Sequence, residues 1–338
     1  MRITLVSDAD LVNSNYRGYQ PLMVLSRRGH DITFTRLGEP RYRASTLLQS
    51  DVVHIHRYTD PELLQIVAQL RDAGIGVVWD NDDDLTAVPR SNPNYRKFGG
   101  PANRARIQAA LRRTVTAADV VTTPSELLAA QYRAAGADDV RLLENYLPPE
   151  FGRVKPAKHD GVTLVWLAGL EHQVDYQRLR LKETLVRLLD AHADLRVLSI
   201  GLGLGLPSDR YEHIRQVDFL ELAKGMSAGD IGLAPLADIP WNQARSNIKL
   251  KEYAAAGLPW LASPVGPYLG LGEKQGGELV PDDAWHDVID RLIVDVRRRR
   301  KLAKNAAKWA KGQSIEDHAH LWDSAFRDAA QRAKRRAL

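Results

Sequence analysis

One segment of the chain combines cations with the predicted start of a helix. Residues 245–263, RSNIKLKEYAAAGLPWLAS, read as a short polar loop, a helix that ends at Gly257 and a buried strand that begins at Pro259. Free backbone N–H groups and the helix dipole at such an N-terminus attract anions. We expect a diphosphate to bind there, near Arg245, Ser246, Asn247, Lys249 and Lys251.

An acidic residue follows these cations on the same predicted helix. Glu252 lies about one and a half turns into it, where a carboxylate accepts hydrogen bonds from sugar hydroxyls just beyond the phosphates. The alternative is an ordinary surface helix with solvated Lys and Glu. The small residues that follow, AAAGL at 254–258, favour a helix packed closely against a sheet.

A second segment places acidic residues at the end of a predicted strand. In VVWDNDDDL, residues 77–85, the apolar run ends at Asp80 and the next carboxylates are Asp82, Asp83 and Asp84. Closely spaced carboxylates repel, so one of them keeps its proton near neutral pH or acts as a general base toward an acceptor hydroxyl. We take Asp82 and Asp83 as catalytic candidates. Two other interpretations stay open: a divalent metal at Asp80-Asn81-Asp82, and an acidic cap on the next segment.

Two histidines lie on a neighbouring predicted strand. In DVVHIHR, His54 and His56 are two residues apart, so they share one face of the strand. His56 ends the strand and is a third catalytic candidate, whereas His54 is expected to be structural.

Apolar strands alternate with helices along the whole chain, which is typical of parallel sheets wrapped by helices. We predict an α/β fold with two doubly wound, Rossmann-like domains facing across a cleft, at residues 1–150 and 151–312, and a terminal helix at 313–338. The segment 144–161 is rich in Pro and Gly and reads as the linker. Strands are expected at 3–7, 32–36, 52–56, 76–80, 120–123, 141–143, 162–167, 196–200, 231–235, 260–263 and 279–280, and residues from 283 onward are expected to be helical.

The composition excludes several kinds of chemistry. The 338 residues contain no cysteine, which excludes disulfides, thiolate catalysis and Cys-based zinc or iron–sulfur sites. No apolar run approaches the roughly 18 residues of a membrane-spanning helix. The first strand turns polar at Asp8, too early for a signal peptide. We therefore expect a cytoplasmic protein, with a peripheral position at a membrane surface as the alternative.

The segment SNIKLKEYAAAGLPWLAS resembles the nucleotide-sugar-binding helix of family-4-type glycosyltransferases, which have the GT-B fold. The resemblance implies hexosyl transfer from a UDP- or GDP-type sugar with retention of anomeric configuration, no metal and no tightly bound cofactor. It also implies that the terminal helix crosses back onto the first domain. The family has two glutamates separated by seven residues. Glu252 matches the second, but Ala244 occupies the position of the first, with Asn242 and Gln243 as the nearest substitutes.

Two further segments match the same family. In WLAGLEHQVDYQRL, the resemblance implies that Gly169, His172 and Asp175 lie near the donor diphosphate, whereas an exposed His and a plain helix cap are the alternative. In SNYRGYQPLM, it implies that Asn15, Tyr16 and Arg17 lie at the tip of a loop that faces the cleft on the acceptor side.

Positive charge is concentrated in two blocks. Residues 297–338 hold thirteen Lys and Arg against four Asp and Glu. Residues 86–117 hold no acidic residue and seven basic ones, Arg90, Arg96, Lys97, Arg104, Arg106, Arg112 and Arg113. In the first domain such a block would attract an anionic acceptor, either a lipid phosphate, an anionic glycan or nucleic acid. We place Arg96 and Lys97 on the acceptor side, and solvated helix faces are the alternative.

Three functions remain compatible with these patterns. The first is a glycosyltransferase with a hydroxyl acceptor, lipid- or glycan-linked by default and modified-base DNA as a minority option. The second is a sugar-nucleotide-binding protein without turnover, which Ala244 favours. The third is an epimerase of GT-B architecture.

Overall fold

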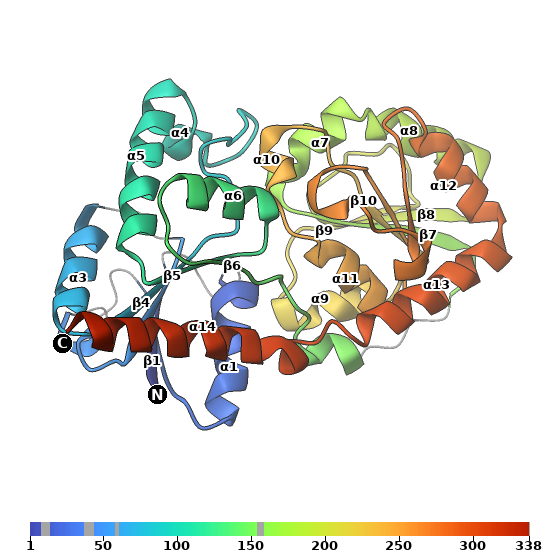
Figure 1. The fold of residues 1–338 in the computed structure, drawn as a ribbon. Coiled ribbons are helices and arrows are strands. Elements are labelled where there is room, and N and C mark those ends of the chain that lie inside the picture. Colours follow the sequence, from blue (N-terminus) through green and yellow to red (C-terminus); the bar gives the residue numbers. More distant parts are fainter. Residues whose placement is uncertain (8–13, 37–43, 58–60, 154–158, 338) are drawn as a thin grey trace.

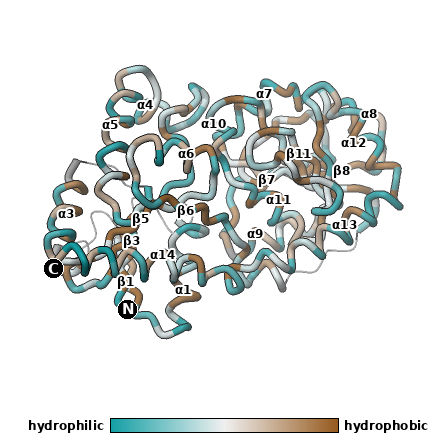
Figure 2. Tube along the Cα trace, viewed as in Figure 1, coloured by the Kyte–Doolittle hydropathy of each residue, from teal (hydrophilic) through white to brown (hydrophobic). Residues whose placement is uncertain are grey.

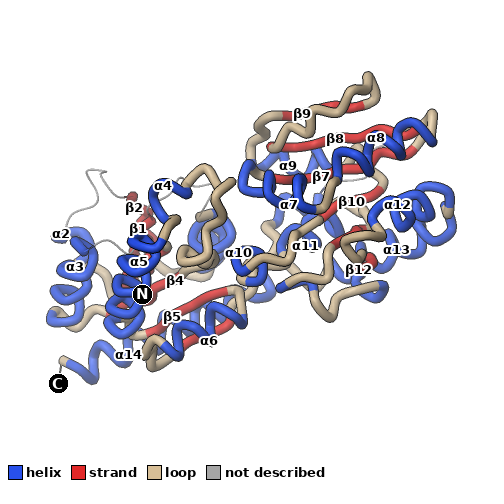
Figure 3. Tube along the Cα trace, turned by 90° about the horizontal axis from the view of Figure 1, so that it is seen from above, coloured by secondary structure: helices blue, strands red, loops and turns tan. Residues whose placement is uncertain are grey.

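The computed structural model describes residues 1–7, 14–36, 44–57, 61–153 and 159–337. Two parallel six-stranded sheets form the centres of two domains, each flanked by helices (Figure 1). Seen from above, the two sheets lie in separate halves of the molecule, with loops and short helices between them (Figure 3). The predicted α/β architecture with two doubly wound domains is confirmed.

The first sheet has the strand order β2-β1-β3-β4-β5-β6. Its central strands read as continuous apolar runs because a parallel sheet is covered on both faces. All five residues of β3 and of β4 are buried. The strands are β1 (Arg2–Ser7), β2 (Asp31–Arg36), β3 (Val52–His56), β4 (Gly76–Asp80), β5 (Val120–Thr123) and β6 (Val140–Leu142).

The second sheet has the order β12-β11-β10-β7-β8-β9. Its strands are β7 (Val162–Ala168), β8 (Leu195–Gly201), β9 (Tyr211–Ile214), β10 (Ile231–Ala234), β11 (Trp260–Ala262) and β12 (Gly277–Leu279). The sequence predictions missed β9. It is an edge strand of the sequence YEHI with two exposed residues, so it lacks the apolar run that marks the other strands.

The helices of the first domain begin with a π-helical turn, η1 (Asn15–Tyr19), which leads into α1 (Gln20–Arg27). The other helices are α2 (Ala44–Leu47), α3 (Pro61–Asp72), α4 (Tyr95–Phe98), α5 (Pro101–Ala117) and α6 (Glu126–Ala134).

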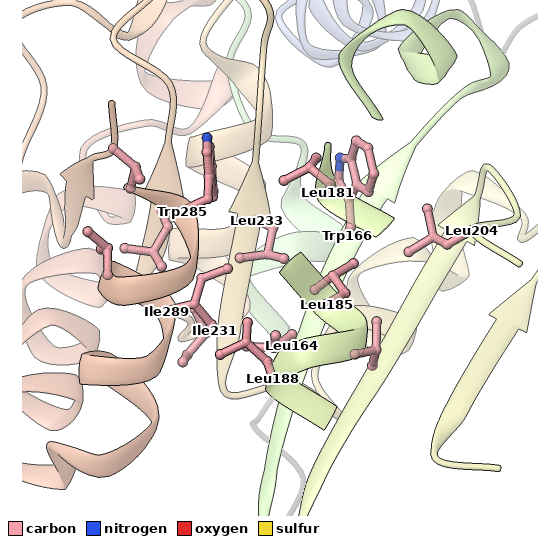
Figure 4. Close-up of a cluster of buried hydrophobic side chains, with 14 of the residues drawn as sticks. Leu164, Trp166, Leu181, Leu185, Leu188, Leu204, Ile231, Leu233, Trp285 and Ile289 are labelled. Atoms are coloured by element: carbon pink, nitrogen blue, oxygen red, sulfur yellow. The ribbon is translucent and has the colours of Figure 1, made fainter. Parts of the chain in front are cut away.

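The helices of the second domain are amphipathic. In α12 (Trp285–Val294), the buried residues fall at helical spacing, at Trp285, Val288, Ile289, Leu292 and Ile293. They pack with leucines of α8 (Leu181–Ala191) and with β7 and β10 in the core shown in Figure 4. Figure 2 shows hydrophobic colour along the strands and polar colour on much of the helical surface. The remaining elements are η2 (Pro149–Arg153), η3 (Leu170–His172), α7 (Gln173–Arg178), α9 (Phe219–Met226), α10 (Pro240–Gln243), α11 (Ile248–Ala255), η4 (Gly266–Tyr268), η5 (Glu273–Gln275) and α13 (Val296–Ala310).

The last helix, α14 (Ile315–Arg336), crosses back to the first domain, as the resemblance implied (Figure 1). Ile315, Trp322 and Phe326 are buried in a core shared with β1, β3 and β4. The prediction of uninterrupted helix from residue 283 is wrong in detail. Asp295 caps α13 by accepting a hydrogen bond from the Arg298 N–H, and Ser314 caps α14 in the same way from the Asp317 N–H, so three helices form.

The chain passes between the domains twice, and the two crossings are bonded to each other. The Leu147 N–H donates to the Gln313 carbonyl at 2.7 Å, and the Ile315 N–H donates to the Leu147 carbonyl at 2.9 Å. Residues 154–158 of the predicted linker lie outside the described residues.

Candidate functional site

The strand order fixes where a ligand can bind. The first sheet changes direction between β1 and β3, and the second between β7 and β10. In open parallel sheets the crevice outside such a switch point binds the ligand. The segments that follow these strands are the π-helical turn η1, His56 and Arg57 in the first domain, and residues 169–175 in the second. Residues 8–13, directly after β1, lie outside the described part.

In the second domain, His172 is held by a fixed set of partners. Its Nδ1 lies 2.7 Å from the Asp175 carboxylate, which also accepts hydrogen bonds from the Ala237 N–H at 2.9 Å and the Asn242 side-chain amide at 2.7 Å. All three side chains are buried, so the exposed-histidine alternative does not hold. Among the described residues, the His172 Nε2 atom is buried without a hydrogen-bond partner. The imidazole is thus oriented at Nδ1, whereas its Nε2 has no hydrogen bond in the described part of the chain and lies 3.8 Å from the Glu171 carboxylate.

The electrostatics of His172 favour a neutral ring in the unliganded protein. Burial lowers the pKa of His172, and Asp175 opposes that shift without cancelling it. An anion at Nε2 would stabilise the protonated form, in which both ring nitrogens donate. The arrangement therefore suits a ring that becomes charged when phosphate arrives.

Two cations face the same region. The Arg245 guanidinium pairs with the Glu171 carboxylate at 3.3 Å, and the Lys249 ammonium donates to the Leu167 carbonyl. Burial lowers the pKa of Lys249, with Glu252 opposing. Burial would raise the pKa of Glu171, but the neighbouring His172 and Arg245 side chains hold it at about 2. Gly169 precedes Glu171, and a Cβ at Gly169 would collide with that carboxylate, so glycine permits this fold-back.

Glu252 is bonded across the cleft. It accepts a hydrogen bond from the Tyr16 hydroxyl of the first domain. Burial raises the pKa of Glu252, and Lys249 opposes that rise. The Tyr16 ring also meets Phe219 edge-on, with 5.3 Å between ring centroids. We call Glu171, His172, Asp175, Arg245, Lys249 and Glu252 the donor-side cluster.

The expectation that Lys251 joins this cluster is wrong. Its side chain is fully buried, donates to Glu144 at 2.7 Å and to the Asn145 carbonyl at 2.9 Å, and lies over the Tyr146 ring. It therefore fastens α11 to the linker. Nearby, Ser246 accepts a hydrogen bond from the Asn145 amide at 3.0 Å, and Asn247 is the N-cap of α11 without a side-chain capping bond.

Neither Asn242 nor Gln243 is available to replace the absent glutamate. The Asn242 amide is bonded to Asp175 and the Ala237 carbonyl, and Gln243 bonds Asp238 and the Gly266 N–H. Ala244 is buried against apolar residues of the first domain, such as Val6 and Ile55.

In the first domain, the carboxylates after β4 are separated by cations. Asp80 is buried and accepts two hydrogen bonds from Arg17, at 3.1 and 2.6 Å. Burial opposes ionisation, but Arg17 outweighs it and the pKa of Asp80 lies below its usual range. Thr122, at the end of β5, donates to the same carboxylate.

Arg57 bridges the next two carboxylates. Its Nε donates to Asp82 at 2.6 Å and its Nη2 to Asp83 at 2.7 Å. Burial would raise the pKa of Asp82, but Arg57 and His56 hold it well below the usual range. The pKa of Asp83 is raised, first by burial and then by Asp82, against the opposing charge of Arg57. His56 Nε2 lies 3.7 Å from both Asp80 and Asp82. We call Asp80, Asp82, Asp83, His56 and Arg57 the acidic cluster.

The structure corrects the prediction that Asn15, Tyr16 and Arg17 form the tip of a loop. These residues form the π-helical turn η1, in which Asn15 and Arg17 are buried. The Arg17 guanidinium also donates to the Leu143 carbonyl and to Asn145 at 3.1 Å. The turn lies in the interior because the Arg17 guanidinium pairs there with the buried Asp80 carboxylate. Arg96 and Lys97, by contrast, lie exposed on α4.

The two clusters act on each other across the cleft. Arg245 lowers and Glu171 raises the pKa of Asp83, and Asp83 in turn raises the pKa of Arg245. The two clusters are therefore close enough to interact electrostatically.

Arg57 and Thr122 were missed from the sequence, and Asn242 was considered only as a substitute for the absent glutamate. Arg57 follows His56 at the end of β3, so its place in the sequence could have indicated a site residue. Asn242 and Thr122 carry no such signal, because each acts through a partner far away in sequence.

Metal-binding groups and membrane-spanning helices are both absent from the described residues. No group of three or more His, Asp or Glu side chains there is arranged to hold a metal ion. No helix in the described ranges is long and apolar enough to cross a membrane.

Comparisons with known proteins agree with this architecture. Residues 17–145 match a family model described as the glycosyl transferase 4-like domain, and no curated protein matches the chain. Sucrose-phosphate synthase from Thermosynechococcus elongatus is 17% identical, with a TM-score of 0.69 over 97% of this chain and 98% of that one. An α-glucosyltransferase, solved with UDP and a 13-mer DNA containing an HMU base, is 12% identical with a TM-score of 0.67 over 98% and 99%. Anabaena HepE, solved with UDP and glucose, is 13% identical with a TM-score of 0.63 over 96% and 98%. At these identities the similarity establishes the fold.

Proposed function

We propose that this chain, a two-domain protein of the GT-B fold with a glycosyl transferase 4-like domain at residues 17–145, transfers a sugar from a nucleotide-diphosphate sugar to a hydroxyl acceptor. One observation carries the proposal. The buried His172 is oriented by Asp175, has an Nε2 atom without a hydrogen bond among the described residues, and shares its switch point with Arg245 and Lys249, opposite the acidic cluster.

The donor side supplies binding and charge neutralisation. In our proposal, Arg245, Lys249 and His172 neutralise the diphosphate, with the N-terminus of α11, Ser246 and Asn247 beside them. Asp175 orients His172, Gly169 leaves room for Glu171, and Glu252 accepts hydrogen bonds from ribose hydroxyls. A UDP-sugar is favoured over a GDP-sugar because HepE and the α-glucosyltransferase were solved with UDP.

The acidic cluster handles the acceptor hydroxyl. Asp83 has the raised pKa that a general base needs, Asp82 stays ionised beside it, and His56 lies behind both. The chain offers no cysteine nucleophile. From the resemblance of residues 246–263 to the family's nucleotide-sugar-binding helix, we propose a hexosyl transfer with retention, in which the departing diphosphate assists and cations replace a metal.

The acceptor binds to the first domain in this proposal. We propose that Asn15 and Tyr16 lie beside the acceptor, and that the exposed Arg96 and Lys97 attract an anionic lipid, glycan or nucleic acid. Arg17 supports Asp80 rather than contacting the acceptor, because its guanidinium is already bonded.

The first experiment measures donor binding. Titration calorimetry with UDP, GDP and ADP identifies the nucleotide. Arg245→Ala removes a charge-assisted bond of about 1.5–3 kcal/mol, so the Kd of the bound nucleotide should rise about tenfold or more. Glu252→Ala should weaken binding similarly. Arg187→Ala, an exposed arginine on α8, is the matched control and should bind as wild type does. Unchanged affinity in both site variants contradicts the proposal.

Product analysis separates the alternatives. Release of free sugar or a glycosylated acceptor from the donor indicates a transferase, an epimerised nucleotide sugar indicates an epimerase, and binding without turnover indicates a binding protein. NMR of the product anomer tests retention. Activity that survives EDTA supports the proposed metal independence, whereas dependence on added manganese contradicts it.

A further inference from the structure

A cavity of about 760 Å³ lies between the domains, beside the site already described. Its wall from the first domain is the loop 84–91 with Tyr95 and the start of α5, and its wall from the second is α7 with Ile239 and Pro240. Asp84 directly follows the acidic cluster, and Val174 lies between His172 and Asp175 in sequence. The cavity is therefore the neighbouring compartment of the same cleft.

Three arginines from both domains converge on this cavity. Arg90 and Arg104 come from the first domain and Arg178 from the second, and all three are exposed. Asp84 is the one acidic residue that the described part of the chain contributes to the lining. Its carboxylate is already bonded by the Thr86 N–H at 2.9 Å, the Thr86 hydroxyl at 2.6 Å and Gln131 at 3.3 Å. No ion pair of Arg90, Arg104 or Arg178 is present among the described residues.

Part of the cavity lining is apolar, and we call this part its floor. Val88, Val174 and Ile239 belong to one buried cluster that joins the two domains, and the Tyr95 ring packs against it. An apolar floor with an aromatic ring, rimmed by polar and charged groups, is typical of sites for small organic ligands, and the volume falls in their usual range of about 300–1,000 Å³.

We propose that this cavity binds the acceptor of the proposed transfer, and that the acceptor is a phosphorylated hydroxyl compound of about the size of one sugar ring. Three like charges around one cavity repel until an anion neutralises them, and guanidinium groups suit phosphate oxygens. The organic part would lie on the apolar floor, with its hydroxyl toward the acidic cluster. Because the arginines come from both domains, the bound phosphate also bridges the cleft.

A compact acceptor explains the lining better than a nucleic acid does. A polynucleotide presents phosphates along a line, and its binding depends on a stripe of cations. The other basic residues of the block, Arg96, Lys97, Arg106, Arg112 and Arg113, do not line the cavity. The proposal concerns a single phosphate group, which a free sugar phosphate and a lipid headgroup share.

The test compares two triple variants of equal charge. Arg90→Gln/Arg104→Gln/Arg178→Gln alters the cavity, and Arg106→Gln/Arg112→Gln/Arg113→Gln alters exposed residues of α5 outside it. Calorimetry with glucose 6-phosphate and glycerol 3-phosphate, and flotation with phosphatidylcholine vesicles with and without phosphatidylinositol, distinguish a free from a lipid-borne source. We expect one source to bind wild type and the α5 variant equally, and the cavity variant about 100-fold more weakly.

Several different results would contradict the proposed acceptor site. Failure of all these probes to bind wild type, or equal loss in both variants, overturns the proposal. So does tight binding of a short DNA duplex that the α5 variant loses, because that indicates a diffuse polyanion surface. UDP affinity is measured on the same preparations. Intact UDP binding without phosphate binding refutes this inference only, whereas phosphate binding without UDP binding refutes the proposed donor.

Discussion

Arg57 holds two carboxylates at once, and its backbone has a φ of 63°. Left-handed backbone in a residue other than glycine costs free energy and persists where surrounding contacts impose it. Here the contacts are the Asp82 and Asp83 carboxylates. Arg57 is therefore a positioning residue that contacts both the carboxylate with the lowered pKa, Asp82, and the carboxylate with the raised pKa, Asp83.

The charge of Arg57 should appear in the pH profile of turnover. A general base works when ionised, so kcat falls as pH drops through its pKa. The pKa of Asp83 is raised despite Arg57, so Arg57→Gln should raise it further and move the acid limb of kcat to higher pH. Arg57→Lys keeps the charge and should leave the limb near its wild-type position. An acid limb that is the same in all three proteins contradicts this role.

His54 gives a pH prediction for stability. Burial lowers the pKa of His54 to about 4, whereas an unfolded histidine has a pKa of about 6.5. As pH falls from about 6.5 to 4, the unfolded state binds the proton first, so stability is lost in this window by about 3 kcal/mol. His54→Leu should remove that share of the pH dependence and cost little at pH 7, because both ring nitrogens are buried without a partner among the described residues. Urea unfolding at several pH values measures both effects, and an identical pH dependence in the variant would refute the assignment.

The positions of several site residues were predictable from the sequence, whereas the hydrogen bonds and ion pairs between them were not. His56, Asp82 and Asp83 lie where parallel strands end, and that edge is readable from apolar runs followed by polar residues. The contact between Tyr16 and Glu252 joins residues 236 positions apart, and no local pattern encodes it. The burial of Arg17 was missed for the same reason.

Among the secondary-structure elements, α14 and β4 pack closely against each other at Gly76. A Cβ at Gly76 would lie 2.8 Å from the Ala329 carbonyl carbon, and the neighbours there are backbone atoms that cannot rotate away. Gly76→Ala should therefore destabilise the protein by about 1–3 kcal/mol. Gly152→Ala, where nothing lies within 4 Å, should change stability by much less. Denaturant midpoints measure the difference, and equal midpoints would show that α14 is not seated as described.

The elements themselves were largely readable from sequence. Fully buried strands such as β3 and β4 give continuous apolar runs, and α12 shows helical spacing of apolar residues. The short polar strand β9 was not predicted, because its pairing with β8 rather than its own residue pattern makes it a strand.

Across the whole molecule, the two domains have separate cores. Phe326 belongs to the first and Trp285 to the second. Either residue changed to Ala should cost about 3–5 kcal/mol in its own domain. Calorimetry should show that Phe326→Ala lowers one unfolding transition and Trp285→Ala the other, and that UDP raises the second-domain transition. A single transition that responds alike to both variants would show that the domains unfold together.

The return of α14 to the first domain has a consequence for synthesis on the ribosome. The first domain emerges early, but Ile3, Val78 and Val120 are buried partly by a helix that is translated after the entire second domain. At about 5–20 residues per second, that apolar surface waits roughly ten to forty seconds for its cover. The second domain can thus complete its core before the first does. A nascent chain stalled ahead of α14 is expected to require a chaperone on its first domain.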